Sequence, residues 1–174
     1  CFIYCYCHFS WILFISQKKK RNISLKKKIC IINPNTTISM TKVIDITAKK
    51  YAGVNTEIIT TQPQTGPESI EGYYDEAFCI PGLIEEINNN MDADGYVIAC
   101  FDDTGLDAVR SMTDKPVIGI GEAAYHVASL VSGNFSVITT LSRSINPLKH
   151  NLKKYGLFEK CVSVTAIEVP VLDL

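Results

Sequence analysis

The stretch Tyr96–Ala108, with the sequence YVIACFDDTGLDA, decides the fold, because an apolar run ends on a cysteine and is followed at once by the start of a helix. The apolar run is short and rich in aromatic and branched residues, and an Asp-Gly pair precedes it, which is typical of a buried parallel strand. Thr104, with Asp107 three residues later, resembles a capping box and predicts a helix from Thr104 to about Met112.

Cys100 is therefore expected at the carboxyl end of a strand and close to the N–H groups of a helix. The helix dipole would stabilise a thiolate there by roughly 0.3–1 kcal/mol. Asp102 and Asp103 would oppose that thiolate if their carboxylates point inward. Ligands of open α/β sheets bind at this edge, so Cys100 is a candidate catalytic residue. The alternative is that it packs as a small apolar side chain, since free cysteines are often buried.

The rest of the chain repeats the strand-then-helix pattern. Strands are predicted at 29–32, 54–61, 96–99, 117–120, 135–141 and 161–167. Helical spacing between them indicates βαβ units and a parallel sheet, so the fold class is α/β. The helix that begins near Ser69 is expected to bend or break at Pro81-Gly82.

Residues 1–27 form an apolar and then basic extension that we place outside the fold. The apolar part is shorter than the about 20 residues that a membrane helix needs, and its positive charge follows the apolar run where a signal peptide would carry it before. A signal anchor remains an alternative. A membrane partner is not expected.

Composition narrows the function classes. The chain has 174 residues, 47% of them hydrophobic, as in a globular protein, and its net charge of −1 offers no basic footprint for nucleic acid. The seven cysteines have no paired spacing typical of zinc, so no metal is expected. Their scatter favours a reducing compartment such as the cytoplasm.

Other motifs are weaker. Gly119-Ile120-Gly121-Glu122-Ala123-Ala124 fits a loose dinucleotide pattern, but the acidic residue expected about twenty positions later is missing, so no nucleotide cofactor is predicted. His126 and His150 have no partner at ligand spacing. Asp102-Asp103 could be metal ligands, but a bare pair is more often solvated.

Four polar residues share a predicted position. Asn33, Cys100, Thr139 and Thr140 each follow or end a parallel strand, so they are expected at one edge of the sheet. An amide, a thiol and hydroxyls near helix N-termini suit a small, oxygen-rich, neutral or anionic ligand.

Several stretches, in the same order, resemble the Asp/Glu/hydantoin racemase family and its hydantoin and allantoin racemase branch. They are 32–37 (INPNTT), 66–72 (GPESIEG), 97–103 (VIACFDD), 116–124 (PVIGIGEAA), 135–141 (FSVITTL) and 169–172 (VPVL). The resemblance covers about residues 28–174.

The resemblance implies a cofactor-independent racemase with two cysteines on opposite faces of the substrate, in a cleft between two similar parallel-sheet halves. The halves would be residues 28–118, which carry Cys100, and residues 119–174. Two-base proton transfer at a carbon next to a carbonyl needs such a pair, and thiols suit it. Asn33, Thr139 and Thr140 would bind the ring carbonyls or the developing oxyanion. The partner is a small molecule from nitrogen or purine catabolism, and a homo-oligomer is compatible with this interpretation.

Two departures from the family pattern matter. The usual Asp-Pro-Gly after the cysteine is Asp103-Thr104-Gly105 here. The family's second cysteine lies beyond Val-Pro-Val-Leu, and this chain stops at Leu174, so the second half is expected to be incomplete and the chain by itself inactive. Glu71 is as readily structural as functional. The alternatives are a lyase or cis–trans isomerase with one cysteine, or a non-catalytic fragment.

Overall fold

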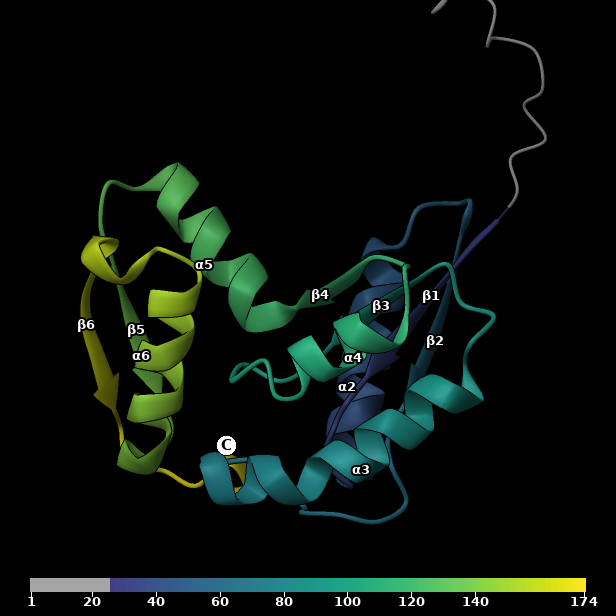
Figure 1. The fold of residues 1–174 in the computed structure, drawn as a ribbon, viewed down its shortest axis with the longest axis horizontal. Coiled ribbons are helices and arrows are strands. Elements are labelled where there is room, and N and C mark those ends of the chain that lie inside the picture. The colour runs from purple at the N-terminus through teal and green to yellow at the C-terminus, as the bar shows by residue number, and fades with distance from the viewer. Residues whose placement is uncertain (1–25) are drawn as a thin grey trace, which may run out of the picture.

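The computed structural model describes residues 26–174, so nearly all of the predicted extension over residues 1–27 lies outside the described part of the chain. Figure 1 shows an α/β fold with parallel strands, as predicted. The first sheet has the order β2-β1-β3-β4 and consists of β1 (Lys27–Ile32), β2 (Thr56–Thr61), β3 (Gly95–Ile98) and β4 (Val117–Gly119). The second pairs β5 (Phe135–Thr139) with β6 (Cys161–Ala166), also in parallel.

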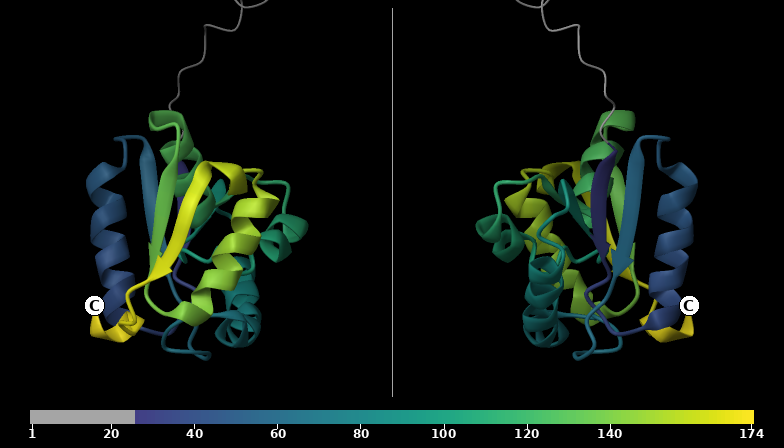
Figure 2. Two further views of the ribbon diagram at one scale, coloured as in Figure 1. Left: turned by 90° about the vertical axis from the view of Figure 1, so that its left-hand side faces the viewer. Right: turned by 90° about the vertical axis from the view of Figure 1, so that its right-hand side faces the viewer.

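Helices connect the strands. They are α2 (Ile38–Tyr51), α3 (Tyr73–Asn89), α4 (Leu106–Met112), α5 (Ile120–Val131) and α6 (Ile145–Lys154), with short 3-10 helices at Ser142–Ser144, Phe158–Lys160 and Val171–Asp173. Figure 2 shows β5 and β6 side by side with α6 against them. None of the helices in residues 26–174 is both long and apolar enough to cross a bilayer.

Two apolar cores hold the fold together. The larger one packs β1, β3 and β4 against α3 and α4 and contains Tyr96, Ile98 and Leu83. The smaller one packs β5 against α5 and α6 and contains Tyr125, Leu148 and other residues. Burying side chains of this size stabilises each cluster by about 1.5–3 kcal/mol per residue relative to exposure. The buried residues of the larger core lie between residues 30 and 117, and those of the smaller core between residues 125 and 157.

The loop after β3 joins the two cores. Cys100 packs against the larger core, whereas the neighbouring Phe101 packs against the smaller one. The ring of Phe101 meets that of Tyr125 edge to face, with centroids 5.4 Å apart. Consecutive residues of one loop therefore belong to different cores, and the loop is fixed from both sides.

Two local predictions differ from the structure in part. The helix expected from Thr104 begins at Leu106 and its N-cap is Gly105, whose φ of 72° is the left-handed conformation that glycine adopts without strain. A Cβ at Gly105 would also fall 2.5 Å from the Leu83 side chain. The helix expected to bend or break at Pro81-Gly82 does not break, since α3 is one continuous helix of 17 residues that contains Pro81.

Candidate functional site

A cavity of about 370 Å³ opens where the parallel strands of both sheets end. Its polar lining comes from the segments that follow β1 and β3 and from the end of β5, and consists of Asn33, Asn35, Cys100, Asp102, Thr139, Thr140 and Ser144. Apolar side chains such as Ile70, Ile167 and Val171 complete the wall. Asn33, Cys100, Thr139 and Thr140 therefore border one cavity, although Asn33 and Thr139 lie 106 positions apart in the sequence (139 minus 33).

Cys100 is partly accessible at this cavity. Its Sγ lies 3.6 Å from the hydroxyl oxygen of Thr104. Burial, followed by the negative charge of Asp102, raises the pKa of Cys100 to about 12, although the Thr104 hydroxyl and the backbone N–H groups of Asp102 and Thr104 favour the thiolate. Burial and the charge of Asp102 therefore act against the thiolate that the helix dipole was expected to stabilise.

Asp102 supplies the charge that opposes the thiolate. Its side chain is buried and its Oδ2 has no hydrogen-bond partner. Burial, and then the nearby carboxyls of Glu76 and Asp103, raise the pKa of Asp102 to about 7. The negative charge of Asp102 therefore opposes ionisation of the Cys100 sulfur.

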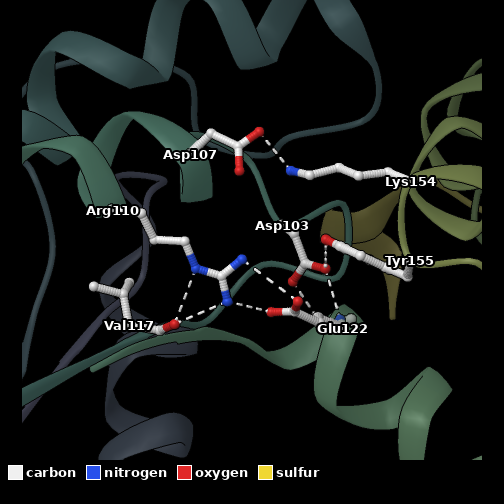
Figure 3. A network of polar contacts seen from close by, with 8 residues as sticks. Asp103, Asp107, Arg110, Val117, Glu122, Lys154 and Tyr155 are labelled. Carbon is white, nitrogen blue, oxygen red and sulfur yellow. Dashed lines mark hydrogen bonds and ion pairs between the residues drawn. The ribbon is translucent and has the colours of Figure 1, made fainter.

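Asp103 has a different role and is turned toward α5 (Figure 3). Its carboxylate accepts hydrogen bonds from the backbone N–H of Gly121 at 2.9 Å, from the backbone N–H of Glu122 at 2.6 Å and from the Tyr155 hydroxyl at 2.8 Å. Burial raises the pKa of Asp103, and these three donors lower it. The first turn of α5 is thus capped from a distant loop.

The same contact explains the small residues of the loose dinucleotide motif. A Cβ at Gly119 would fall 2.0 Å from Oδ1 of Asp103, and one at Gly121 would fall 2.3 Å from the backbone oxygen of Phe101. The helix N-terminus that holds a pyrophosphate in dinucleotide-binding folds is filled here by the protein's own carboxylate. The close approach of the Phe101–Asp103 loop therefore accounts for the two glycines.

Near this cap, two ion pairs connect α4 to α5 and α6. Arg110 pairs with Glu122 and also donates to the backbone oxygen of Val117 at 3.0 Å (Figure 3). Asp107 pairs with Lys154 of α6 rather than closing a capping box with Thr104. The capping-box interpretation was therefore wrong, and Asp107 instead links α4 to α6.

Asn33 is 1% exposed, and its amide is used within its own loop. Its Nδ2 donates to Oδ1 of Asn35 at 2.8 Å and to the Thr41 hydroxyl at 3.0 Å. Oδ1 of Asn35 also accepts the backbone N–H of Thr37 at 3.0 Å. Asn33 borders the cavity, but its donors organise the turn from β1 into α2.

Thr139 and Thr140 end the fifth strand. Their backbone oxygens accept the N–H groups of Ile167 at 3.0 Å and of Val169 at 3.2 Å, which draws the segment after β6 alongside. Neither hydroxyl has a hydrogen-bond partner among residues 26–174. Both hydroxyls therefore keep hydrogen-bonding capacity for a ligand.

Glu71 links the segment after β6 to the 3-10 helix that follows β5. The residue is 4% exposed, and its carboxylate pairs with Arg143 and accepts the backbone N–H of Val171 at 2.7 Å. It is absent from the residues that line the cavity. Of the two interpretations left open by the sequence, the contacts of Glu71 favour the structural one.

The remaining described cysteines lie elsewhere. Cys161 pairs with Phe135 at the start of its strand, at the end of the sheet opposite to Thr139. Cys30 lies within β1 and Cys79 on α3, and both are fully buried. Burial raises the pKa of each of these two thiols to about 12. Cys100 is thus the cysteine that borders the cavity within residues 26–174.

Neither described histidine lies beside Cys100. His150 on α6 forms a 2.8 Å hydrogen bond with the Tyr73 hydroxyl, and His126 on α5 lies near the ring of Tyr155. A cysteine–histidine hydrolase would need an imidazole next to the sulfur. Among the described residues no group of three His, Cys, Asp or Glu side chains is placed to hold a metal ion.

Sequence reasoning missed several lining residues. Asn35 lies two residues after Asn33 in the same turn, so its amide could have been predicted to border the cavity as well. Ser144 and Val171 come from segments that follow β5 and β6. Val171 lies in the quoted stretch 169–172, whereas nothing in the local sequence marks Ser144.

The comparisons agree with this geometry. A hydantoin racemase from Pseudomonas sp. (strain NS671) is 45% identical over 148 residues, which are 84% of this chain and 59% of the relative. The structure of an allantoin racemase from Klebsiella pneumoniae superposes with a TM-score of 0.81 at 43% identity, over 84% of this chain and 60% of that one. An allantoin racemase from Pseudomonas fluorescens gives a TM-score of 0.80 at 31% identity, over 84% and 63% of the two chains.

The chain thus spans about three fifths of the length of these relatives. The family model described as Asp/Glu/Hydantoin racemase matches residues 29–174. On the strength of that match and of the 45% identical relative, this chain belongs to the Asp/Glu/hydantoin racemase family.

Proposed function

We propose that this chain contributes to a cofactor-independent racemase of hydantoin-type rings, such as allantoin or a 5-substituted hydantoin. The observation that carries the proposal is the cavity that brings the Cys100 sulfur together with the free hydroxyls of Thr139 and Thr140. The names of the relatives, which are hydantoin and allantoin racemases, support the substrate class. We place the protein in nitrogen or purine catabolism and in the cytoplasm.

Racemisation requires two proton transfers at the stereocentre. One group removes the proton from the carbon next to a ring carbonyl, and a second returns a proton to the opposite face of the planar intermediate. We assign Cys100 to one face. The hydroxyls of Thr139 and Thr140 would donate hydrogen bonds to the carbonyl oxygen as negative charge develops on it, and Asn33 would hold the turn that borders the ring.

We assign the opposite acid/base to a cysteine outside residues 26–174. Cys30, Cys79 and Cys161 do not border the cavity, which supports this assignment. The division into halves at residues 118 and 119 belongs to the same proposal, as does assembly of further chain or a second copy around the cleft. We expect the chain of 174 residues by itself not to racemise.

The test has two parts. The first follows the optical rotation of one enantiomer of allantoin with the chain alone, and sustained decay would show that both acid/base groups lie within it. The second measures whether allantoin slows alkylation of Cys100 by iodoacetamide near neutral pH, with the Cys100→Ser variant to identify the modified site. Slower alkylation supports a substrate cavity at Cys100, and an unchanged rate contradicts it.

A second candidate is a lyase or a cis–trans isomerase of the same fold, in which one cysteine suffices. The presence of a single cysteine at the cavity, within residues 26–174, favours it. Solvent deuterium distinguishes the two. A racemase incorporates deuterium at the stereocentre of recovered substrate, whereas the single-cysteine alternative leaves that position unlabelled. A fragment without catalysis would show neither deuterium incorporation nor protection of Cys100.

A further inference from the structure

Glu71 lies behind the wall of the Cys100 cavity and contacts two other segments of the chain. Its carboxylate pairs with Arg143, in the 3-10 helix that follows β5, and accepts the backbone N–H of Val171 at 2.7 Å. Val171 lies 100 positions after Glu71 in the sequence. One buried carboxylate thus holds two segments that lie far from it along the chain.

Each of these three segments contributes a residue to the cavity wall, and these residues are Ile70, Ser144 and Val171. Ile70 comes directly before Glu71, and Ser144 comes directly after Arg143. Ile70 and Ser144 are buried, so a shift of either one would disturb the side chains packed around it. The contacts of Glu71 therefore lie directly behind three different parts of the wall.

The segment after β6 depends on this carboxylate. As far as Val169, its backbone is hydrogen-bonded to the chain at the end of β5. Within the described residues 26–174, the bond from Val171 to Glu71 is the one hydrogen bond that joins residues 170–174 to the rest of the chain. Val171 and Leu174 both border the cavity. Loss of the bond to Glu71 would therefore release this part of the wall.

A strained turn precedes this part of the wall. Glu168 has a φ of 55°, a left-handed conformation that costs a residue other than glycine roughly 1–2 kcal/mol. Such a conformation persists where the surrounding contacts hold it. The contacts that follow the turn are the hydrogen bond from Val169 to the backbone oxygen of Thr140 at 3.2 Å and the bond from Val171 to Glu71. Glu71 therefore helps to hold the turn as well as the wall.

The backbone around Glu71 is itself held in place. The backbone N–H of Glu71 donates to Oδ2 of Asp75, in the first turn of α3, at 3.0 Å. The next residue, Gly72, approaches the 3-10 helix closely, since a Cβ there would fall 3.3 Å from the backbone oxygen of Arg143. The carboxylate of Glu71 thus extends from a fixed backbone to the segments that it holds.

We propose that Glu71 is a positioning residue for the Cys100 cavity: through Arg143 and Val171 it holds three parts of the wall in place, and the affinity of the cavity for its ligand depends on it. Glu71 does not border the cavity, so it acts through these two residues and not by touching the ligand. The inference rests on the proposed function, because it takes this cavity to be the substrate site.

Hydrogen exchange of the chain without a ligand tests whether Glu71 holds the wall. Glu71→Ala removes both contacts, so the Val171 amide should exchange about tenfold faster, because its acceptor is lost. The Val169 amide keeps its own acceptor and should change much less. NMR measures both amides in one sample. An unchanged exchange rate at Val171 would overturn the inference.

Protection of Cys100 by allantoin tests the consequence for the ligand. In Glu71→Ala, the allantoin concentration that halves the rate of alkylation by iodoacetamide should rise about fivefold, because the wall is no longer preorganised. Arg143→Lys keeps the positive charge that pairs with Glu71 and should keep the original concentration. No rise in Glu71→Ala would contradict the dependence of ligand affinity on Glu71.

Glu86→Ala is the matched control. Glu86 is a buried glutamate on α3 that accepts a hydrogen bond from the Thr61 hydroxyl, and it does not border the Cys100 cavity. Its replacement should destabilise the fold and leave the Val171 exchange and the allantoin protection near their original values. Equal changes in Glu71→Ala and Glu86→Ala would indicate a general loosening of the fold and overturn the inference.

Two further outcomes are decisive. If Glu71→Ala does not fold, as judged by circular dichroism, Arg143→Gln decides, since the Arg143 side chain is exposed and this variant breaks the ion pair alone. It should raise the halving concentration of allantoin about twofold, and no rise would overturn the inference. If allantoin does not protect Cys100 in the unmodified chain, the proposed function fails, and the Val171 exchange still decides whether Glu71 positions the wall.

Discussion

The hydroxyl of Tyr155, the residue that ends α6, donates a 2.8 Å hydrogen bond to the carboxylate of Asp103. Asp103 lies three residues after Cys100 and also caps α5. Asp103 therefore links the loop that carries Cys100 to α5 and α6, the two helices of the smaller core. The position of the Cys100 sulfur depends on packing in both parts of the molecule.

The first prediction concerns the hydroxyl of Tyr155. Tyr155→Phe should lower the free energy of unfolding by about 1–2 kcal/mol, because a buried carboxylate loses one of three donors. Urea unfolding followed by circular dichroism measures the change. Tyr74→Phe is the matched control, since Tyr74 lies exposed on α3, and it should cost much less. Equal losses in the two variants would contradict a role for the Asp103 contact.

The second prediction concerns the close approach behind that loop. Gly121→Ala should destabilise the chain by about 2–4 kcal/mol, since its Cβ would meet the Phe101 backbone oxygen at 2.3 Å and the Asp103 carboxylate at 2.8 Å. Gly133→Ala is the control, because nothing lies within 4 Å of a Cβ there. The difference between the two midpoints of urea unfolding is the measured quantity, and similar midpoints would rule out the steric argument.

The sequence predicted the strands well because each combines apolar residues with turn residues on either side. It also predicted the common edge of Asn33, Cys100 and Thr139, since parallel strands end on the same side of a sheet. It could not predict where Asp103 points. That carboxylate bonds to residues 18, 19 and 52 positions away, and such contacts leave no periodicity in the local sequence.

At Thr104, by contrast, a local sequence pattern led to a wrong prediction. Its spacing to Asp107 fits a capping box, but Gly105 adopts the left-handed conformation and α4 begins after it. The Thr104 hydroxyl turns to the Cys100 sulfur instead. Local propensity was overridden here by the packing of the loop against Leu83. The sequence also gave no sign of the burial and of the Asp102 charge, both of which raise the pKa of Cys100.

The third prediction follows from the raised pKa of Asp102, which is about 7 in the folded chain and near its ordinary value of 3.8 when unfolded. The folded chain binds more protons between these values, so the contribution of Asp102 to stability is lost as the pH rises from about 4 through 7. Asp102→Asn should abolish this loss and raise the free energy of unfolding at pH 8 by about 1–3 kcal/mol. Urea unfolding at pH 5 and pH 8 measures it.

The expected pattern is specific in pH. The gap between the variant and the unmodified chain should be smaller at pH 5, where Asp102 is ionised in the unfolded chain but protonated in the folded one and only part of the loss has occurred, and it should widen toward pH 8. Asp45→Asn, at an exposed pair on α2, should show no such widening. A constant gap at both pH values would mean that the amide stabilises the fold by some means other than relief of the buried charge.

The fourth prediction tests the hydroxyls at the end of β5. If the Thr139 hydroxyl binds a ring carbonyl, Thr139→Val keeps the shape of the side chain and loses the donor, at a cost of about 1 kcal/mol, or about fivefold in affinity. The affinity is read as the allantoin concentration that halves the rate of Cys100 alkylation.

Thr165→Val is the matched control, because Thr165 is exposed on β6 and does not border the cavity. The alkylation rate without allantoin should stay the same in both variants, so that a change in protection reports the ligand contact and not the reactivity of the sulfur. Equal protection in Thr139→Val and Thr165→Val would remove the Thr139 hydroxyl from the binding site and leave Thr140 as the donor to examine.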